Sequence, residues 1–188
     1  MTLPDIRKYR QEMKKLKLPD NIALVLEDTP EKFQPLAEEI VPPLVELLRK
    51  RNDLEREICA RALKLREEEA AAGLPLYQYT PENAALDEEF FRRYLELAEP
   101  RCTEKILKWG PARSYGKPAK YDYLFDAPDA KVFFTMKSPK KALVFSRNPV
   151  SHDYGYRFTL RPIEGAWMID GIESALGSQE PWGVEHSL

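Results

Sequence analysis

The sequence predicts an α+β protein in which N-terminal helices pack on a curved antiparallel sheet. Apolar residues recur at steps of three and four through most of the first 110 residues, which is the period of an amphipathic helix. From Tyr121 to Ser174, apolar and polar residues alternate in short runs separated by turn signals, as in hairpin-linked strands. Helices followed by a run of strands favour an α+β architecture.

The first helical segments carry recognisable start signals. A short basic amphipathic helix is expected over residues 4–17. Thr29 is typical of an N-cap, because its hydroxyl can accept a hydrogen bond from a free amide of the first turn, and Pro30 suits the first helical position. Pro42 and Pro43 are expected to kink or restart this helix, because neither has an amide hydrogen to donate.

The helical pattern then continues from Leu44 to Gly73, with Arg51 and Arg61 inserted in its apolar stripe. About 30 helical residues would span about 45 Å, which exceeds the diameter of a small domain. Part of this helix should therefore project, or pack on another helix or another chain. Self-association through the long helix is one of the readings that its length leaves open.

Another helix is expected after Thr80, which again precedes a proline and suits an N-cap. One face of this helix places Phe90 and Tyr94 in the predicted core. The glycine and proline at residues 110–111 close the helical part of the chain.

Five strands are expected in the last third of the chain. They cover residues 120–125, 131–137, 141–147, 154–163 and 165–172. The glutamate and glycine at 164–165 are typical of a tight hairpin turn between the last two strands. The strands supply the remaining core candidates, which are Phe134, Phe158, Trp167 and Ile169.

These elements divide the chain into three parts. Residues 1–75 form an N-terminal helical segment, and residues 76–177 combine one helix with the antiparallel sheet. Residues 178–188 show no periodicity and are expected to form a loose tail.

Composition favours a soluble protein of the cytoplasm. The chain has 188 residues, of which 43% are hydrophobic and 32% charged. No apolar run approaches the roughly 20 residues that span a bilayer, and the N-terminus lacks the apolar region of a secretory signal. For the same reason we expect no membrane association. Cys59 and Cys102 lie far apart in predicted helices, so we expect both thiols to be reduced.

Charge is unevenly distributed, although the net charge is only −2. Residues 21–100 carry 10 basic and 18 acidic groups, whereas residues 101–150 carry 11 basic and four acidic groups. The two regions either neutralise each other within the molecule or face different partners.

No catalytic motif is present. The two histidines, His152 and His186, are expected in a loop and in the tail. The alternative to a non-catalytic protein is an enzyme with one of two general bases. These are His152, which Asp153 could orient, and Asp170 in the last strand. The aspartates and cysteines lack metal-ligand spacing. We therefore expect no catalytic residue, no metal and no cofactor.

Tyrosine and arginine residues gather in the predicted sheet. Tyrosines near basic residues can stack nucleic-acid bases, but tyrosine is also an ordinary sheet residue, and we expect no nucleic-acid partner. Tyrosine and arginine are enriched at the energetic centres of protein interfaces. The candidate partner-binding residues are Arg147, His152, Tyr154, Arg157 and Arg161.

The closing strands resemble a known family. The segment YRFTLRPIEGAWMIDGI, at residues 156–172, resembles the closing hairpin of the nuclear transport factor 2-like fold, a cone-shaped domain of helices and a curved sheet. The segment TMKSPKKALV, at residues 135–144, is similar to immunity proteins of bacterial polymorphic toxin systems, including those beside Rhs-repeat toxins. The resemblance covers roughly residues 80–175.

The resemblance implies a binding function. Such immunity proteins bind the C-terminal domain of a cognate toxin in the cytoplasm and neutralise it stoichiometrically, without chemistry of their own. The alternative is a small-molecule binder or an enzyme of the isomerase or dehydratase type, with its site in the cone pocket.

Overall fold

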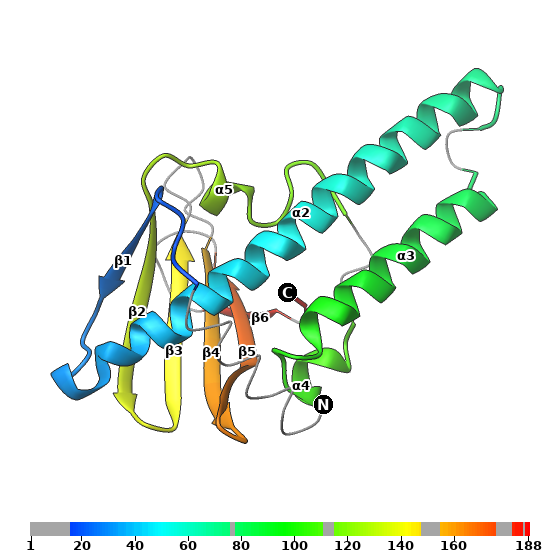
Figure 1. The fold of residues 1–188 in the computed structure, drawn as a ribbon. Helices are drawn as coiled ribbons and strands as arrows, with labels where there is room; N and C mark the ends of the chain where they lie inside the picture. Colours follow the sequence, from blue (N-terminus) through cyan, green and yellow to red (C-terminus); the bar gives the residue numbers. More distant parts are fainter. Residues whose placement is uncertain (1–15, 76–77, 111–114, 148–154, 176–181, 186) are drawn as a thin grey trace.

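The computed structural model describes residues 16–75, 78–110, 115–147, 155–175, 182–185 and 187–188. It shows an α+β fold in which a long helix, α2, crosses a six-stranded sheet, and a second helix, α3, runs beside α2 (Figure 1). The elements in chain order are β1 (Ile22–Leu26), the 3-10 helix η1 (Glu31–Phe33), α2 (Pro35–Ala71), α3 (Pro81–Ala98), α4 (Glu104–Leu107), α5 (Asp122–Phe125), β2 (Ala130–Ser138), β3 (Lys141–Arg147), β4 (Gly155–Ile163), β5 (Ala166–Ala175) and β6 (Gly183–Glu185).

The sheet is mixed rather than purely antiparallel. Its strands follow the chain order from β1 to β6, and it does not close on itself. β1 pairs with β2 in parallel, whereas every other neighbouring pair is antiparallel. β1 was not expected, because its five residues form a continuous apolar run without the alternation that marks a half-buried strand.

Helix α2 runs for 37 residues without restarting at Pro42 and Pro43. Both prolines are buried among apolar neighbours, so packing favours a continuous helix. The carbonyls that lose their helical partners belong to Glu38 and Glu39, which are exposed, and water can take the place of the missing amides. The expected short helix at residues 4–17 falls almost wholly outside the described residues.

The second half of α2 projects beyond the sheet and pairs with α3, as its length predicted (Figure 1). Buried apolar residues from both helices, Ile58, Ala62, Leu86 and Phe90, line the contact. Arg61 and Arg93 add ion pairs to Glu89 and Glu57, with N–O distances of 2.8 and 2.7 Å. Exposed pairs of this kind contribute at most about 1 kcal/mol each, so the apolar contact holds the hairpin together.

Strands β2 to β5 lie where the alternation placed them, but the strand expected at residues 120–125 is wrong. That segment contains the single helical turn α5. The Glu164-Gly165 hairpin turn is confirmed, with φ angles of 49° and 78° at the two residues. In β5 the register skips Asp170, so Ile169 and Ile172 both face the core instead of opposite faces.

One hydrophobic core joins the helices to the sheet. Five of the six core candidates are buried, namely Phe90, Tyr94, Phe134, Phe158 and Ile169. Trp167 is only partly buried and packs against the edge of this core, because it lies opposite Pro162 near the end of the β4–β5 hairpin.

The tail expected to be loose contributes to the fold. Residues 183–185 form β6, which pairs with β5, and Leu188 is 1% exposed within the core. We call residues 182–185 and 187–188 the C-terminal strap. Among the residues described, no helix combines the length and the apolar character that crossing a bilayer requires.

Candidate functional site

The face of the sheet that points away from α2, called the outer face here, is the first candidate site. Alternate residues of β2, β3 and β4 are buried against the helices, and the residues between them point to the other side. The buried residues of α4 and α5 belong to the same core as α2. The described helices therefore pack on one side of the sheet and leave the outer face uncovered by any of them.

Two phenylalanines lie side by side on the part of this face formed by β2 and β3. Phe133 of β2 is directly opposite Phe145 of β3, and their rings stack with centroids 4.8 Å apart and planes 8° from parallel. The next pair along these strands is Thr135 with Leu143. All four side chains are partly exposed, so the face presents a small apolar surface there.

Basic residues surround the phenylalanine pair. Lys131, Lys137, Lys141, Arg147, Arg157 and Arg161 occupy alternate positions of β2, β3 and β4 on this face. Three of these basic groups have acidic partners, since Arg157 pairs with Glu173, Arg161 with Asp170 and Lys137 with Asp28, whereas Lys131, Lys141 and Arg147 form the basic excess. The excess of basic groups gives the outer face a positive potential.

The structure brings three of the five candidate partner-binding residues, Arg147, Arg157 and Arg161, onto the outer face. Arg157 is held by two hydrogen bonds to Glu173, at 2.9 and 3.1 Å, and lies over the ring of Trp182. These contacts connect β4, β5 and the strap. The other two candidates, His152 and Tyr154, lie outside the described residues, as does His186.

Both carboxylate oxygens of Asp170 have partners within the fold, which argues against a role as general base. One carboxylate oxygen accepts a hydrogen bond from Thr103 at 3.2 Å, and the other pairs with Arg161 at 2.8 Å. The main chain of Thr103 also donates to Ile169. Asp170 therefore ties the segment before α4 to β4 and β5.

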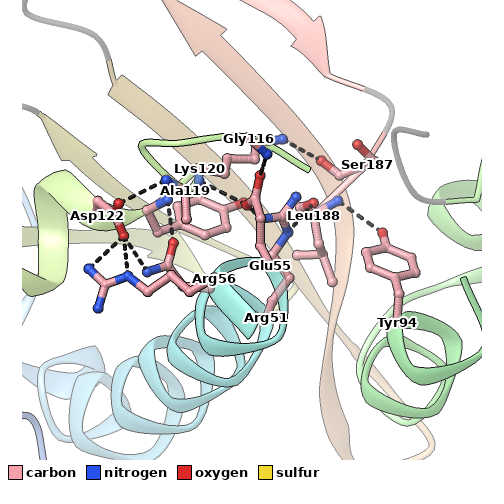
Figure 2. Close-up of polar contacts among 12 residues, drawn as sticks. Arg51, Glu55, Arg56, Tyr94, Gly116, Ala119, Lys120, Asp122, Ser187 and Leu188 are labelled. Atoms are coloured by element: carbon pink, nitrogen blue, oxygen red, sulfur yellow. Dashed lines mark hydrogen bonds and ion pairs between the residues drawn. The ribbon is translucent and has the colours of Figure 1, made fainter. Parts of the chain in front are cut away.

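The second candidate site is a buried polar cluster between α2, the segment before α5, and the strap (Figure 2). Arg51, Asn52 and Glu55 of α2 are at most 5% exposed. Arg51 and Glu55 form an ion pair one turn apart. Glu55 also accepts hydrogen bonds from the amides of Gly116 and Lys120, at 3.1 and 2.9 Å.

Asn52 explains why residues 120–125 do not form a strand. Its side-chain oxygen accepts a hydrogen bond from the amide of Tyr121 at 2.8 Å, and its side-chain nitrogen donates to Asp122 at 2.8 Å. Arg56 donates to the same carboxylate at 2.7 Å. These contacts hold the turn of α5 against α2, so the amides that a strand would present to a neighbour are already used.

Lys120 is the most chemically distinctive group of the cluster. Its ammonium nitrogen donates to the main-chain oxygen of Ser187 at 2.9 Å, lies 3.7 Å from Glu185, and sits over the ring of Tyr156. Burial, with a smaller contribution from nearby Arg51, lowers the pKa of Lys120 to about 8, although Glu185 opposes this shift. A lysine amine with such a pKa can act as a base or nucleophile when a substrate can reach it.

In this structure the strap covers the cluster. Arg51 donates to the main-chain oxygen of Leu188 at 3.0 Å, and the amide of Leu188 donates to the hydroxyl of Tyr94 at 3.0 Å. The buried cations are thus used to hold the strap in place. Sequence reasoning missed this role, although Arg51 within the apolar stripe of α2 was the signal that could have revealed it.

Metal and thiol chemistry find no support in the described part of the chain. No group of three or more histidine, cysteine, aspartate or glutamate side chains is placed there to hold a metal ion. Cys59 and Cys102 are both free thiols, and burial raises the pKa of Cys102 to about 12, which keeps it protonated.

Comparison with known proteins adds no family to this picture. No protein-family model, curated protein or solved structure matches the chain.

Proposed function

We propose that this chain is an immunity protein that binds a bacterial toxin domain and neutralises it through a one-to-one protein contact, without chemistry of its own. The proposal places the complex in the cytoplasm. It rests on the likeness of residues 135–144 and 156–172 to such proteins, and on one structural observation, the outer face that none of the described helices covers.

The outer face has the composition of a protein-binding surface. It carries the stacked pair Phe133 and Phe145, and the surround of this pair carries Lys131, Lys141 and Arg147. Aromatic and arginine side chains are enriched at interface centres, while surrounding charges speed the encounter and select the partner. An acidic surface on the toxin domain would complement this face.

We also propose that the fold is a form of the nuclear transport factor 2-like cone. Register irregularities lie between β2 and β3 and between β4 and β5. Such bulges bend a sheet and increase its twist, which is how a flat sheet becomes one wall of a cone.

The test is co-expression with the toxin domain encoded beside this chain, followed by purification through a tag on one partner. The proposal expects rescued growth and a one-to-one complex. The double variant Lys141→Glu and Arg147→Glu should weaken binding at least tenfold while its melting temperature stays within a few degrees, because the two side chains are exposed or partly exposed on the outer face.

A matched control separates the outer face from the long helix. Lys64→Glu makes the same kind of charge change on the projecting part of α2, where Lys64 is exposed. It should leave binding unchanged. Loss of binding in Lys64→Glu, with none in the β3 double variant, would move the contact to α2. Excess single-stranded DNA should not displace the toxin domain, and displacement would contradict the expected absence of a nucleic-acid partner.

The alternative is a small-molecule binder or enzyme, and buried Lys120 with its lowered pKa is the observation that favours it. Lys120→Met tests this reading. A chain that neutralises the toxin domain as well as wild type after this change acts through its surface. Loss of function in a folded Lys120→Met variant would instead support chemistry or ligand binding at the buried cluster.

A further inference from the structure

A groove along α3 lies apart from both the outer face and the buried polar cluster. It has a volume of about 480 Å³ and runs between α3, Tyr79 before this helix, and Tyr115 after α4. Its α3 residues include Asp87, Glu88 and Phe91, which are spaced to share one face of the helix. We call it the α3 groove.

Aromatic rings form much of its wall. Tyr79 is 64% exposed and Phe91 is 44% exposed, although both are large side chains that proteins usually cover. Below them, Tyr115 packs edge-on against buried Phe90, with ring centroids 5.6 Å apart. The ring of Phe91 lies so close to Gly110 that a Cβ added there would come within 3.1 Å of it. The backbone at Gly110 therefore backs this ring.

A single carboxylate organises the tyrosines. The hydroxyl of Tyr79 donates to one oxygen of Asp87 at 2.6 Å, and the hydroxyl of Tyr115 donates to the other at 3.0 Å. Burial and the negative Asp87 together raise the pKa of Tyr115 to about 12, so this phenol keeps its proton at neutral pH. Each oxygen of Asp87 still has a lone pair available for another donor.

Among the described residues that line the groove, Asp87 and Glu88 are acidic and none is basic. Arg66 on α2 is a described cation whose field reaches Tyr115. Aromatic ring faces attract cations through their quadrupole, and carboxylates attract them directly. A guanidinium group suits both kinds of wall, because it is planar, weakly hydrated and able to donate two parallel hydrogen bonds.

We propose that the α3 groove binds an arginine side chain presented by a partner protein, with the guanidinium against Phe91 and its N–H groups directed to Asp87 and Glu88. This site goes beyond the proposed function, since it lies on the helical hairpin and carries the opposite charge to the outer face. It would give the molecule a second contact, selective for a basic segment.

The probe is acetyl-Gly-Arg-Gly-amide, titrated into the full chain and followed by NMR of the aromatic side chains. Its matched control is the same peptide with citrulline, which has the shape of arginine without its charge. The arginine peptide should shift the ring signals of Phe91 and Tyr115 in a saturable way, and the citrulline peptide should not.

Two variants and a control complete the test. Asp87→Asn keeps an oxygen and the shape of the side chain, and should weaken binding about tenfold or more, because the negative charge that strengthens the hydrogen bonds to a guanidinium is lost. Phe91→Leu should also weaken binding of the arginine peptide, because leucine keeps the groove wall apolar but lacks the aromatic ring face that attracts a cation. Glu39→Gln removes an exposed acid far along α2 and should change nothing.

Three outcomes would overturn the proposal. Equal shifts with the arginine and citrulline peptides would show an apolar groove without selectivity for charge. Shifts confined to residues of the outer face would place the peptide elsewhere. Unchanged affinity in a folded Asp87→Asn variant would remove the carboxylate from the site. None of these results depends on the toxin domain, so failure here is distinct from failure of the proposed function.

Discussion

Single buried groups show how this molecule uses polar chemistry inside its core. A buried cation without partners would cost several kcal/mol, so such groups are kept only where acceptors surround them. Arg51 has Glu55 and the main-chain oxygen of Leu188, and Lys120 has Glu185 and the main-chain oxygen of Ser187. Apart from Glu55, which is one helical turn from Arg51, these partners lie far away in the sequence, so the two side chains specify a tertiary contact.

Two buried tyrosines should respond in opposite ways to the loss of their hydroxyl. Tyr94→Phe should destabilise the protein by about 1–3 kcal/mol, because the buried amide of Leu188 loses its acceptor. The hydroxyl of Tyr121 is buried and has no hydrogen-bond partner among the described residues. Tyr121→Phe should therefore be neutral or stabilising by up to about 1 kcal/mol. Urea unfolding of both variants checks the pair, and equal destabilisation would contradict it.

Lys120 should make stability depend on pH. Its pKa is about 8 in the folded protein against an ordinary value of 10.5. Between these values the unfolded chain binds a proton that the folded chain lacks, so this group makes the free energy of unfolding rise with pH, by up to about 3 kcal/mol in total. Below about pH 8 both states are protonated, and its contribution is constant.

The measurement compares wild type with Lys120→Met by urea unfolding at pH 7.5 and 9.5. Comparing the two chains cancels the contributions of Cys102 and the buried tyrosines, whose raised pKa values act in the opposite direction. The wild type should gain about 2 kcal/mol relative to the variant over this range. Parallel pH profiles would mean that Lys120 titrates normally.

Elements of this fold divide their residues between different tasks. The first half of α2 packs on the sheet, its middle carries the polar cluster, and its last turns form the hairpin with α3. At the start of α3, Thr80 accepts a hydrogen bond from the amide of Asn83 as an N-cap should, and both side chains also donate to Glu69 of α2. The strap depends on the rest of the fold, since its six described residues take their structure from β5, Arg51, Lys120 and Tyr94.

Two substitutions within the strap test whether it is part of the core. Leu188→Ala should cost about 2–5 kcal/mol, because Leu188 is buried within the core. Val184→Ala in the same strap should cost less than about 0.5 kcal/mol, because Val184 is 71% exposed. Thermal unfolding of the two variants is the measurement. Similar, small effects would mean that the strap is loose, as its sequence suggested.

The whole molecule is organised around one core, to which segments distant in sequence contribute. Ile40, Val41 and Leu44 of α2 lie in the same cluster as Phe134 and Phe158 of the sheet. β1 also belongs to the sheet, although it precedes α2. Self-association through the long helix stays a prediction, but the projecting half of α2 already has α3 as a partner.

Because the core is shared, the chain should unfold in a single cooperative transition. A fragment of residues 78–188 lacks β1 and α2, and so loses the apolar side chains that cover the inner face of the sheet. It should therefore fail to fold. Circular dichroism and calorimetry of the fragment and the full chain check this. A folded fragment with a sharp melting transition would show that the sheet and α3 form an independent domain.

The sequence by itself determined the elements whose signals are local. The helical period and the Thr80 cap defined α3, short apolar or alternating runs between turn signals defined β2 to β5, and the glutamate and glycine at 164–165 defined their last hairpin. The alternation of β4 placed Arg157 and Arg161 on one face, which is why part of the candidate site was predictable, whereas the structure added Arg147 to that face. These features depend on neighbours within a few residues, so they can be recognised without the fold.

Only the tertiary structure decided the segments that take their conformation from distant partners. β1 lacks the alternation of a half-buried strand and β6 has only three residues, and the two are strands because β2 and β5 pair with them. Residues 120–125 alternate like a strand, but their hydrogen bonds to Asn52 hold them as a helical turn. In β5 the register skips Asp170, so residues after this position face the opposite side of the sheet from the one that alternation predicts. The α3 groove likewise joins Tyr79, Asp87 and Tyr115, which the chain separates by up to 36 positions. In each case the deciding hydrogen bonds or contacts come from residues that no local pattern connects.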